Sequence, residues 1–427
     1  MAEIEPLEAL HYDQAKTGGL QEVVAPPYDV IDAEQRAELE ARSPYNVVRI
    51  DLPRGPEPYE SAAAQLAAWR ADGAIVRDQQ PALWVLAQDY TGPDGRARTR
   101  RGFLGRVRVE DYGAGRIRPH ERTHPGPKED RLRLTRATKA NLSPIFSLFS
   151  DPENSTWEAL EPATDSPPWA RTVDVDGTVN RLWRVADQDA IGSVKRALGG
   201  TELLIADGHH RYETARVYAE EVGGEGPHRY VLMCLVTLQD PGLTVFPTHR
   251  LVRGLDSDRQ EALASAIKEN FEIEPLADRE ALSPESSNEI RIGYIDAHSR
   301  QPLMLTLKSQ EIADAALPGH AEPYRRLDTA VLEALILKGT LGLSDEDIDH
   351  LAGLGYARDL GHALRLVDTG EYDAAFLMAP TPVQQVQEVA AAGESMPPKS
   401  TYFFPKVPTG LVFSPLADQR PDQRPPS

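Results

Sequence analysis

The chain has 427 residues, 41% hydrophobic and 26% charged, which is enough for two or three globular domains with a sizeable core. Its 66 Asp and Glu against 46 Lys and Arg give a formal net charge of -20, which disfavours nucleic acid and anionic membranes as partners unless the basic residues gather in one place. The one cysteine, Cys234, excludes an internal disulfide and a multi-cysteine zinc site, and its apolar neighbours predict a buried thiol.

The N-terminus has neither the basic nor the apolar segment of a signal peptide. No apolar run approaches the ~18 residues that a transmembrane helix needs. We therefore expect a soluble, cytoplasmic protein whose partners are small molecules, and we leave homo-oligomer formation open.

The first predicted elements are a turn, two helices and a strand. Two prolines forbid a regular helix at 25–29, and Asp32 is the N-cap candidate of a helix over 32–42. Alternation at 47–52 predicts a strand, and the Ala-rich stretch 58–72 predicts a helix.

Hairpin and strand–turn–helix patterns follow. Apolar runs at 83–87 and 102–107 flank a Gly-Pro-Asp-Gly turn, which predicts antiparallel strands. The short apolar run 203–206 predicts a buried strand that enters a glycine turn and then a helix from about 209 to 222, and 231–238 predicts another buried strand.

The chain changes character near residue 255. The expected elements there are a helix at 258–270, strands at 290–296 and 303–307, and helices at 328–338 and 345–367. A strand at 374–378 is predicted to rejoin the first sheet.

These elements divide the chain into four parts. We predict an N-terminal α/β domain over 1–254, an inserted α+β domain over 255–370, and a return to the first domain over 371–413. The tail 414–427 repeats Asp-Gln-Arg-Pro and is predicted to be disordered.

The turn at 206–211 is the main candidate for chemistry. A buried strand that ends in a glycine turn and opens a helix directs backbone N–H groups and the positive helix end at one point, where anions bind. Gly208 permits close approach of a ligand, and Arg211 can fork onto phosphate oxygens. His209 and His210 can donate hydrogen bonds or move protons near neutral pH.

Asp207 has two interpretations. Beside a bound anion it could accept a hydroxyl proton or hold Mg²⁺. Alternatively, Asp207 is only a helix N-cap, and His209 and His210 are packing or surface groups. Two histidines and an arginine directly on the helix start favour the functional interpretation.

Basic residues concentrate in the window 96–139, which holds 14 Lys or Arg and five acids and so carries +9 in a chain of -20. Over 96–108 the basic residues alternate along strands, which is typical of a solvated face. The segment 118–131 is dense in His, Lys, Arg and Pro, and we interpret it as an anion clamp.

The first half of this clamp is predicted to be a loop and the second half a helix. A helix over 128–140 places Lys128 and Arg131 on one face, where both could bind phosphate. Glu121 is a carboxylate well placed to be a general base.

Two further stretches, 245–250 and 396–406, place cations and hydroxyls beside apolar anchors. Together with the loops described above they supply the substrate-binding candidates, which are Asp29, His120, Thr248, His249, Arg250 and Lys399.

Several separated motifs resemble one family. The chain is similar, from about 5 to 413, to the bacterial and archaeal family called domain of unknown function 1015. The motifs that carry the resemblance lie at 24–31, 45–49, 120–132, 140–146, 206–215 and 397–406.

At Asp-Gly-His-His-Arg that family resembles the free serine kinases of the ParB/sulfiredoxin-like superfamily. The resemblance implies an α/β (α+β) fold with a ParB/sulfiredoxin-like phosphate-binding core and a mixed sheet, elaborated by additional α+β segments. It also implies phosphorylation of free L-serine to O-phosphoserine, with ADP, ATP or, in some members, pyrophosphate as the donor.

The resemblance also assigns roles. The donor phosphates would be held by Gly208, His209, His210 and Arg211. Asp207 would lie at the acceptor or at Mg²⁺, the expected cofactor, and Glu121 and Asp29 are the candidates for the base. Glu333 stands where many relatives have His, which puts a ligand role there in doubt.

We therefore expect a phosphotransferase that acts on a small hydroxyl, most simply L-serine, with His209 and His210 also in the catalytic group. The alternative is a nucleotide-binding regulatory switch of the ParB-like type without kinase activity. Since the sequence has no P-loop and no kinase-type Gly-rich loop, a short donor such as pyrophosphate is favoured over a nucleotide.

Overall fold

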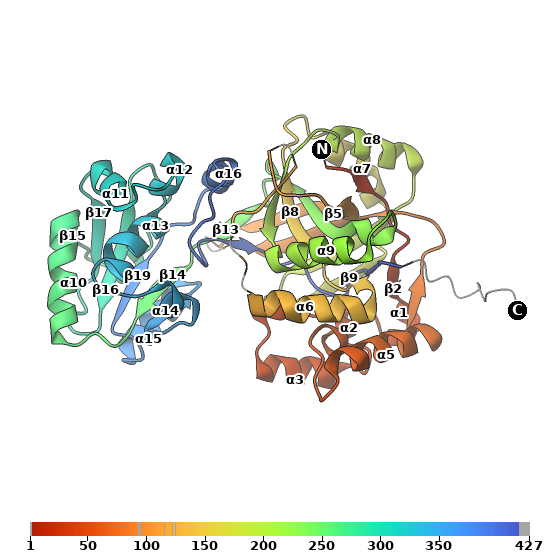
Figure 1. Cartoon of the computed structure of the whole chain (residues 1–427), viewed down its shortest axis with the longest axis horizontal. Helices are drawn as coiled ribbons and strands as arrows, with labels where there is room; N and C mark the ends of the chain where they lie inside the picture. The colour runs from red at the N-terminus through yellow and green to blue at the C-terminus, as the bar shows by residue number, and fades with distance from the viewer. Residues whose placement is uncertain (1, 93–94, 115, 122, 124, 418–427) are drawn as a thin grey trace, which may run out of the picture. The chain divides into compact units, whose positions relative to one another are not determined.

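The computed structural model describes residues 2–417 except 93–94, 115, 122 and 124. The chain forms two compact units (Figure 1). The first comprises Met1–Pro119, Thr123–Leu243 and Pro405–Ser427, and the second comprises His120–Arg122 and Thr244–Phe404.

A nine-stranded mixed sheet is the centre of the first unit, so the predicted α/β fold with a mixed sheet is confirmed. Its path is β6-β11-β8-β12-β5-β4-β10-β9, and β1 adds to β5. The pairs β11·β6 and β12·β8 are parallel, and the other pairs are antiparallel. The strands are β1 (Ile4–Glu5), β4 (Leu83–Thr91), β5 (Ala97–Arg108), β6 (Ile117–Arg118), β8 (Ile145–Phe149), β9 (Ala170–Val173), β10 (Val179–Val185), β11 (Leu203–Asp207) and β12 (Tyr230–Thr237).

Helices and two small sheets surround this centre. The small sheets pair β2 (Leu10–Tyr12) with β3 (Ile75–Arg77) and β7 (Ala140–Asn141) with β21 (Ser414–Pro415). The helices are α1 (Gln14–Thr17), α2 (Leu20–Val23), α3 (Ala33–Arg42), α4 (Val48–Asp51), α5 (Pro58–Ala71), α6 (Pro125–Thr138), α7 (Ser155–Leu160), α8 (Gln188–Leu198) and α9 (His209–Val222), with 3-10 turns at Tyr28–Val30, Glu161–Asp165 and Pro227–Arg229. Helix α6 packs against α9 and α5, and α7 packs against α8.

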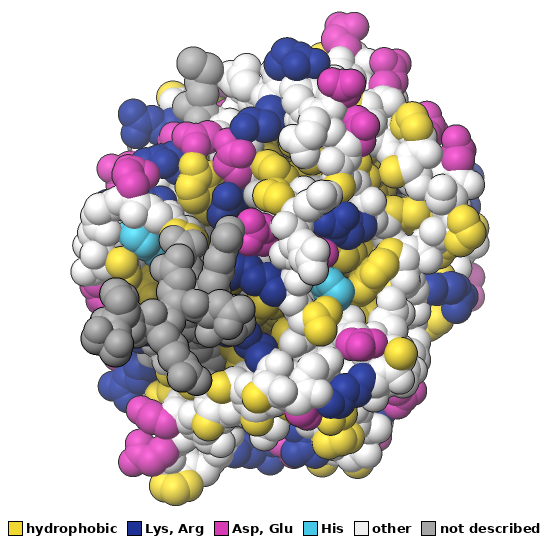
Figure 2. Space-filling model, turned by 90° about the vertical axis from the view of Figure 1, so that its right-hand side faces the viewer, with side chains coloured by type: hydrophobic (Ala, Val, Ile, Leu, Met, Phe, Trp, Pro, Cys, Tyr) yellow, Lys and Arg dark blue, Asp and Glu magenta, His cyan; other side chains and the backbone are white. Residues whose placement is uncertain are grey.

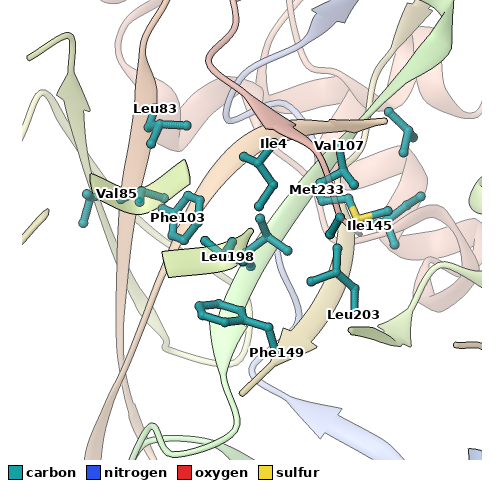
Figure 3. Packing of buried hydrophobic residues seen from close by; sticks show 14 of the residues in the cluster. Ile4, Leu83, Val85, Phe103, Val107, Ile145, Phe149, Leu198, Leu203 and Met233 are labelled. Carbon is teal, nitrogen blue, oxygen red and sulfur yellow. The ribbon is translucent and has the colours of Figure 1, made fainter. Parts of the chain in front are cut away.

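The core of the first unit lies between the sheet and the apolar side of α8. Phe103 from β5, Met233 from β12 and Leu203 from β11 point into one cluster with Leu198 from α8 (Figure 3). Strand β12 is buried at every position but the first, because both faces of the sheet are covered there. Cys234 lies in this strand and is buried, as predicted.

The second unit has its own six-stranded antiparallel sheet, in the order β15-β17-β16-β19-β14-β18, and a separate pair β13·β20. The strands are β13 (Thr244–Phe246), β14 (His249–Val252), β15 (Phe271–Pro275), β16 (Arg291–Asp296), β17 (Leu303–Leu307), β18 (Leu354–Ala357), β19 (Ala374–Leu377) and β20 (Tyr402–Phe404). The helices are α10 (Ser257–Asn270), α11 (Gln310–Ala316), α12 (Glu322–Arg325), α13 (Asp328–Leu332), α14 (Asp345–Asp349), α15 (Leu360–Asp368) and α16 (Val383–Ala391), with a 3-10 turn at Arg279–Leu282 and a π-helix at Glu333–Lys338.

Local signals were accurate where a cap or turn accompanied the hydrophobic pattern. Helix α3 begins after Asp32, whose carboxylate accepts the Gln35 N–H at 2.8 Å. The predicted hairpin is the pair β4·β5, and the predicted Ala-rich helix is α5.

The predicted strand at 47–52 is wrong, because these residues form the short helix α4. The Asn46 carboxamide accepts the Val48 N–H at 3.1 Å and donates to the Glu22 carbonyl at 2.9 Å, which fixes a helical turn here. Alternating apolar residues are equally compatible with one buried turn of helix, so periodicity over six residues does not separate the two.

The predicted domain boundaries also need correction. The second unit runs from Thr244 to Phe404 rather than over 255–370, because β14 and β19 pair with each other inside its sheet. The strand predicted at 374–378 therefore does not return to the first sheet. The helix predicted at 345–367 is interrupted by β18, since Gly353 takes a positive φ of 80° and ends the helical stretch.

Two other predicted segments, the helix at 128–140 and the tail at 414–427, have different bounds in the structure. Helix α6 starts at Pro125, earlier than predicted, because proline is tolerated in the first helical turn. Of the tail predicted to be disordered, Ser414–Pro415 forms β21 and Leu416 is buried, while 418–427 lies outside the described residues.

Acidic and basic side chains alternate over the face of the molecule in Figure 2, where the described residues form no broad field of one sign. Within the described parts of the chain, none of the helices is both long and apolar enough to cross a membrane.

Candidate functional site

The predicted strand–turn–helix is confirmed, as β11 ends at Asp207 and α9 begins at His209. Gly208 is the N-cap, with φ +99°, a backbone conformation that L side chains rarely adopt. A Cβ at Gly208 would lie 3.0 Å from Nε of Arg211, so glycine also lets this side chain lie against the turn.

Asp207 does not cap α9. The N-cap of this helix is Gly208, which has no side chain, so the alternative of Asp207 as only an N-cap is wrong. The start of α9 directs backbone N–H groups to one point, as helix N-termini do at anion sites.

Two cations hold the Asp207 carboxylate. Lys406 Nζ donates to its Oδ1 at 2.7 Å, and Arg211 Nη2 donates to its Oδ2 at 2.8 Å. Burial by itself raises the pKa of Asp207, but the charges of Lys406 and Arg211 outweigh it and hold that pKa well below its usual range. Asp207 is therefore an anion at neutral pH, and a weak base.

Arg211 is fixed by a second set of acceptors. Its Nη1 donates to the Ser143 hydroxyl at 2.7 Å and to the Pro144 carbonyl. The Thr409 hydroxyl donates in turn to the Ser143 hydroxyl at 3.0 Å. The guanidinium is thus positioned by three separate segments of the first unit.

A third cation, Arg100 of β5, is buried in the core of the first unit. Its side chain is 1% exposed, and its guanidinium lies 4.3 Å from the ring centroid of Phe146, the residue opposite Asp207 in β8. Burial lowers the pKa of Arg100 to about 10, although Cys234 and, more weakly, Asp207 raise it. Its Nε donates to the Gln88 side-chain oxygen at 3.1 Å.

Gln88 links Arg100 to Lys406. Its Nε2 donates to the Lys406 carbonyl at 3.1 Å and to the Asn180 side-chain oxygen at 2.7 Å. A continuous buried hydrogen-bonded chain therefore runs from Arg100 through Gln88 to the backbone of Lys406.

The charges at this point do not cancel. Lys406 and Arg211 both lower the pKa of Asp207, and His209, buried at 3% exposure, lowers it further. Two cations in contact with one carboxylate leave an excess of positive charge there, which a bound anion would neutralise.

Arg211 also lines a pocket with about 470 Å³ of empty space, part of it open to solvent. Its polar lining includes Tyr28, Asp51, Arg131, Asn141, Ser143 and Arg211. Asp51 is 4% exposed, and burial raises its pKa against the opposing effect of Arg131. The Tyr28 ring covers the Arg131 guanidinium at 4.3 Å, and burial raises the pKa of Tyr28 to about 12.

Three further predicted site residues, Arg131, Lys128 and Asp29, lie at separate places in the first unit. Arg131 donates to the Asp51 backbone oxygen at 2.7 Å and to the Asp130 carboxylate from Nε at 2.8 Å, so its guanidinium is held by the protein itself. Lys128 is half-buried on α6, and Asp29 is exposed in the 3-10 turn Tyr28–Val30. Other basic residues of the stretch 96–139 likewise pair with acidic side chains, as Arg118 does with Glu202 at 2.9 Å.

The other predicted site residues belong to the second unit, namely His120, Glu121, Thr248, His249, Arg250 and Lys399. His120 is buried, with Nε2 2.9 Å from the Thr401 hydroxyl, and the Met396 N–H donates to the His120 carbonyl at 2.8 Å. Glu121 is half-buried, and Lys399 is exposed at φ 57°.

His249 and Arg250 are buried at the start of β14. His249 Nδ1 accepts the Met378 N–H at 3.1 Å, and burial, with Arg250, lowers the pKa of His249 to about 4. Arg250 donates to the Thr248 carbonyl and to the Pro398 carbonyl, the latter at 3.2 Å. Burial raises the pKa of Asp328 to about 6, against the charge of Arg250.

Sequence reasoning missed Lys406, Arg100, Ser143 and Asp51 as site residues. Lys406 and Ser143 lie in stretches singled out for their motifs, so a signal existed, but nothing in the sequence indicates that Lys406 reaches Asp207. Arg100 was assigned to a solvated face, which is wrong, because alternate residues of β5 point into the core.

The residues around Asp207 do not fit direct Mg²⁺ coordination as they stand. Both carboxylate oxygens accept hydrogen bonds from cations, and a metal ion would have to displace Lys406 or Arg211. Among the residues that the structure describes, no group of three His, Cys, Asp or Glu could hold a metal ion.

Comparisons with known proteins give one clear match and several weak ones. A search of the curated proteins finds no match. Among solved structures, a conserved hypothetical protein from Pyrococcus furiosus is 16% identical (TM-score 0.35, covering 69% of this chain and 92% of that one). A free serine kinase in complex with AMP is 16% identical (TM-score 0.34, 69% and 88%). SbnI with a C-terminal truncation, from Staphylococcus aureus, is 13% identical (TM-score 0.37, 75% and 90%).

At these identities and TM-scores the likeness to solved structures does not extend to function. The family model described as "Protein of unknown function (DUF1015)" matches residues 4–330, which is well over half of the sequence. The chain therefore belongs to the DUF1015 family.

Proposed function

We propose that the chain is a phosphotransferase that moves a phosphoryl group from pyrophosphate, ADP or ATP onto the hydroxyl of a small acceptor, with free L-serine as the favoured acceptor. The observation that supports this proposal is the excess of buried positive charge beside the start of α9, where Lys406 and Arg211 both contact the single carboxylate of Asp207. Phosphoryl transfer depends mostly on positioning and on positive charge around the moving group.

In this proposal the phosphate lies at the first turn of α9. The backbone N–H groups after Gly208 and the side chains of His209 and His210 donate to its oxygens, and Arg211 and Lys406 supply charge. Lys128 is the further phosphate-binding candidate on α6. Arg131 was the other candidate. Its guanidinium already donates to Asp51 and Asp130, so it would shape the pocket wall rather than bind the phosphate itself.

Asp207 has an electrostatic role rather than that of a base. A carboxylate whose pKa is far below its usual range accepts a proton poorly, so Asp207 orients Lys406 and Arg211. The base is proposed to be Glu121 or Asp29. His120, Thr248, His249, Arg250 and Lys399 remain the candidates for contacts with the acceptor.

Mg²⁺ enters the proposal as a companion of the donor phosphates. Because Asp207 is engaged by two cations, the metal would be bound mainly by phosphate oxygens and water, as Mg²⁺ often is at nucleotide sites. The metal would neutralise donor charge, while the residues named above hold and orient the phosphates.

The test is direct. Purified protein is incubated with L-serine, Mg²⁺ and, in turn, pyrophosphate, ADP and ATP, and phosphoserine is measured. We expect phosphoserine with at least one donor and its loss in Asp207→Asn, whereas Asp187→Asn, which alters the N-cap of α8, should keep full activity. Tight nucleotide binding without phosphoserine would contradict the proposal and favour a nucleotide-binding switch.

A further inference from the structure

A second pocket of the first unit has about 830 Å³ of empty space, part of it open to solvent. It shares no lining residue with the pocket that Arg211 lines. Its charged lining consists of Arg77, Arg106 and Glu8, and most of the remaining surface is carbon, from Leu7, Pro81, Pro227, Pro415 and the ring of Tyr230. None of these residues takes part in the site at Asp207.

Arg106 of β5 is a half-buried cation without an acidic partner among the residues that the structure describes. Its Nε is buried and makes no hydrogen bond, whereas both Nη nitrogens stay accessible and donate to none of the described residues. Its guanidinium carbon lies 5.0 Å from the ring centroid of Tyr230, which fixes the side chain in the pocket wall. Arginines withdrawn from water are normally paired, so Arg106 has donors left for a ligand.

The acids near Arg106 are bound by other cations. Glu8 accepts from Arg77 Nη2 at 3.0 Å, so these two lining charges cancel. Glu5, which lies opposite Arg106 in β1, binds Lys195 Nζ at 2.6 Å. Two arginines against one glutamate leave the pocket with a single positive charge, that of Arg106. A monovalent anion neutralises this charge, whereas a dianion such as phosphate would leave negative charge beside Glu8.

We propose that this pocket binds a small organic carboxylate. The two carboxylate oxygens accept from the Nη groups of Arg106, in the forked geometry that a guanidinium offers, and the carbon chain packs on Leu7 and the prolines of the lining. The inference does not depend on phosphoryl transfer, since it concerns residues that the proposed function does not use.

The test uses butyrate as the probe and butyramide, which has the same carbon chain without the charge, as its matched control, in ligand-observed NMR titrations of the full chain near neutral pH. The wild type should prefer butyrate by about tenfold or more, since charge-assisted hydrogen bonds are the strong ones. Arg106→Gln should lose this preference. Arg108→Gln should retain it, because Arg108 lies on the same face of β5 and near the same Tyr230 ring but binds Glu225 at 2.7 Å and is not part of the lining.

A second variant guards against misfolding of Arg106→Gln. Glu8→Gln removes the negative charge that opposes a carboxylate and releases Arg77 from its ion pair, so butyrate binding should tighten about threefold or more, a gain that misfolding cannot produce.

Three results would overturn the inference: equal binding of the two probes to the wild type, butyrate binding unchanged in Arg106→Gln, or no tightening in Glu8→Gln. Binding of inorganic phosphate that is lost in Arg106→Gln would assign the pocket to phosphate instead of a carboxylate. Pyrophosphate binding at the start of α9 should be unchanged in Arg106→Gln, so it reports separately on the proposed function.

Discussion

Lys406 and Asp207 lie 199 positions apart in the sequence, and Lys406 Nζ donates to Asp207 Oδ1 at 2.7 Å. The contact joins the C-terminal segment of the first unit to the end of β11. It leaves the side chains of Lys406 and Asp207 only 13% and 16% exposed, so the pair is largely withdrawn from water.

Lys406→Met should therefore affect both stability and anion binding. Removing one partner of a buried pair costs about 3–5 kcal/mol, and because Arg211 still neutralises Asp207 we expect a loss near 3 kcal/mol in urea unfolding. Pyrophosphate affinity should fall at least tenfold. Lys195→Met removes an exposed pair with Glu5 and should cost no more than about 1 kcal/mol, and equal losses for the two variants would contradict this prediction.

The pH dependence of stability should report on Asp207. Its folded pKa lies below the unfolded value of about 3.9, so its stabilising contribution is full above that value and is lost as pH falls through the folded pKa. Urea unfolding between pH 5 and 2 should show a falling limb that Asp207→Asn flattens. A limb of unchanged steepness in the variant would mean that other carboxylates cause it.

His249 should give a second signature at higher pH. Its folded pKa is lowered to about 4 from 6.5, so the unfolded chain binds a proton that the folded second unit resists. Stability from this group is complete above pH 6.5 and declines as pH falls towards 4. A ring NMR titration should show no protonation of His249 at pH 5.5. His249→Asn should remove that resonance and reduce the slope of the unfolding free energy against pH. Asp328, with a pKa raised to about 6, has the opposite effect on the pH dependence of stability, so Asp328→Asn should steepen that slope.

Gly208→Ala should be costly for two reasons. The new Cβ needs φ +99°, a strain of about 1–2 kcal/mol, and it would lie 3.0 Å from Nε of Arg211. Anion affinity should therefore fall together with stability. The matched control is Gly177→Ala, which has φ +80° and nothing within 4 Å, and which should lose stability but keep pyrophosphate binding.

Metal removal distinguishes Mg²⁺ that is bound to the phosphate donor from Mg²⁺ that is bound to the protein. We expect calorimetry to show no tight Mg²⁺ binding to the protein alone, and binding once pyrophosphate is present, because Asp207 is occupied by Lys406 and Arg211. EDTA should stop phosphoserine formation without lowering the midpoint of urea unfolding. Tight Mg²⁺ binding to the protein alone would contradict this expectation.

The sequence by itself determined the local machinery of the site. The β11–Gly208–α9 turn was predictable, because its strand, glycine and helix signals are all within a few residues of one another. The α3 cap and the β4·β5 hairpin were predictable for the same reason. Short-range hydrogen bonding and side-chain period decide such features.

Only the tertiary structure decided which charges meet at that turn. Lys406 reaches Asp207 through the path of the C-terminal segment, and β19 pairs in the second sheet rather than the first. Long-range pairing of this kind depends on the packing of whole elements, which leaves no local pattern in the sequence. The same packing buries Asp51 against Arg131 and leaves one of its oxygens unpartnered among the described residues, so the pocket beside Arg211 could be found only in three dimensions.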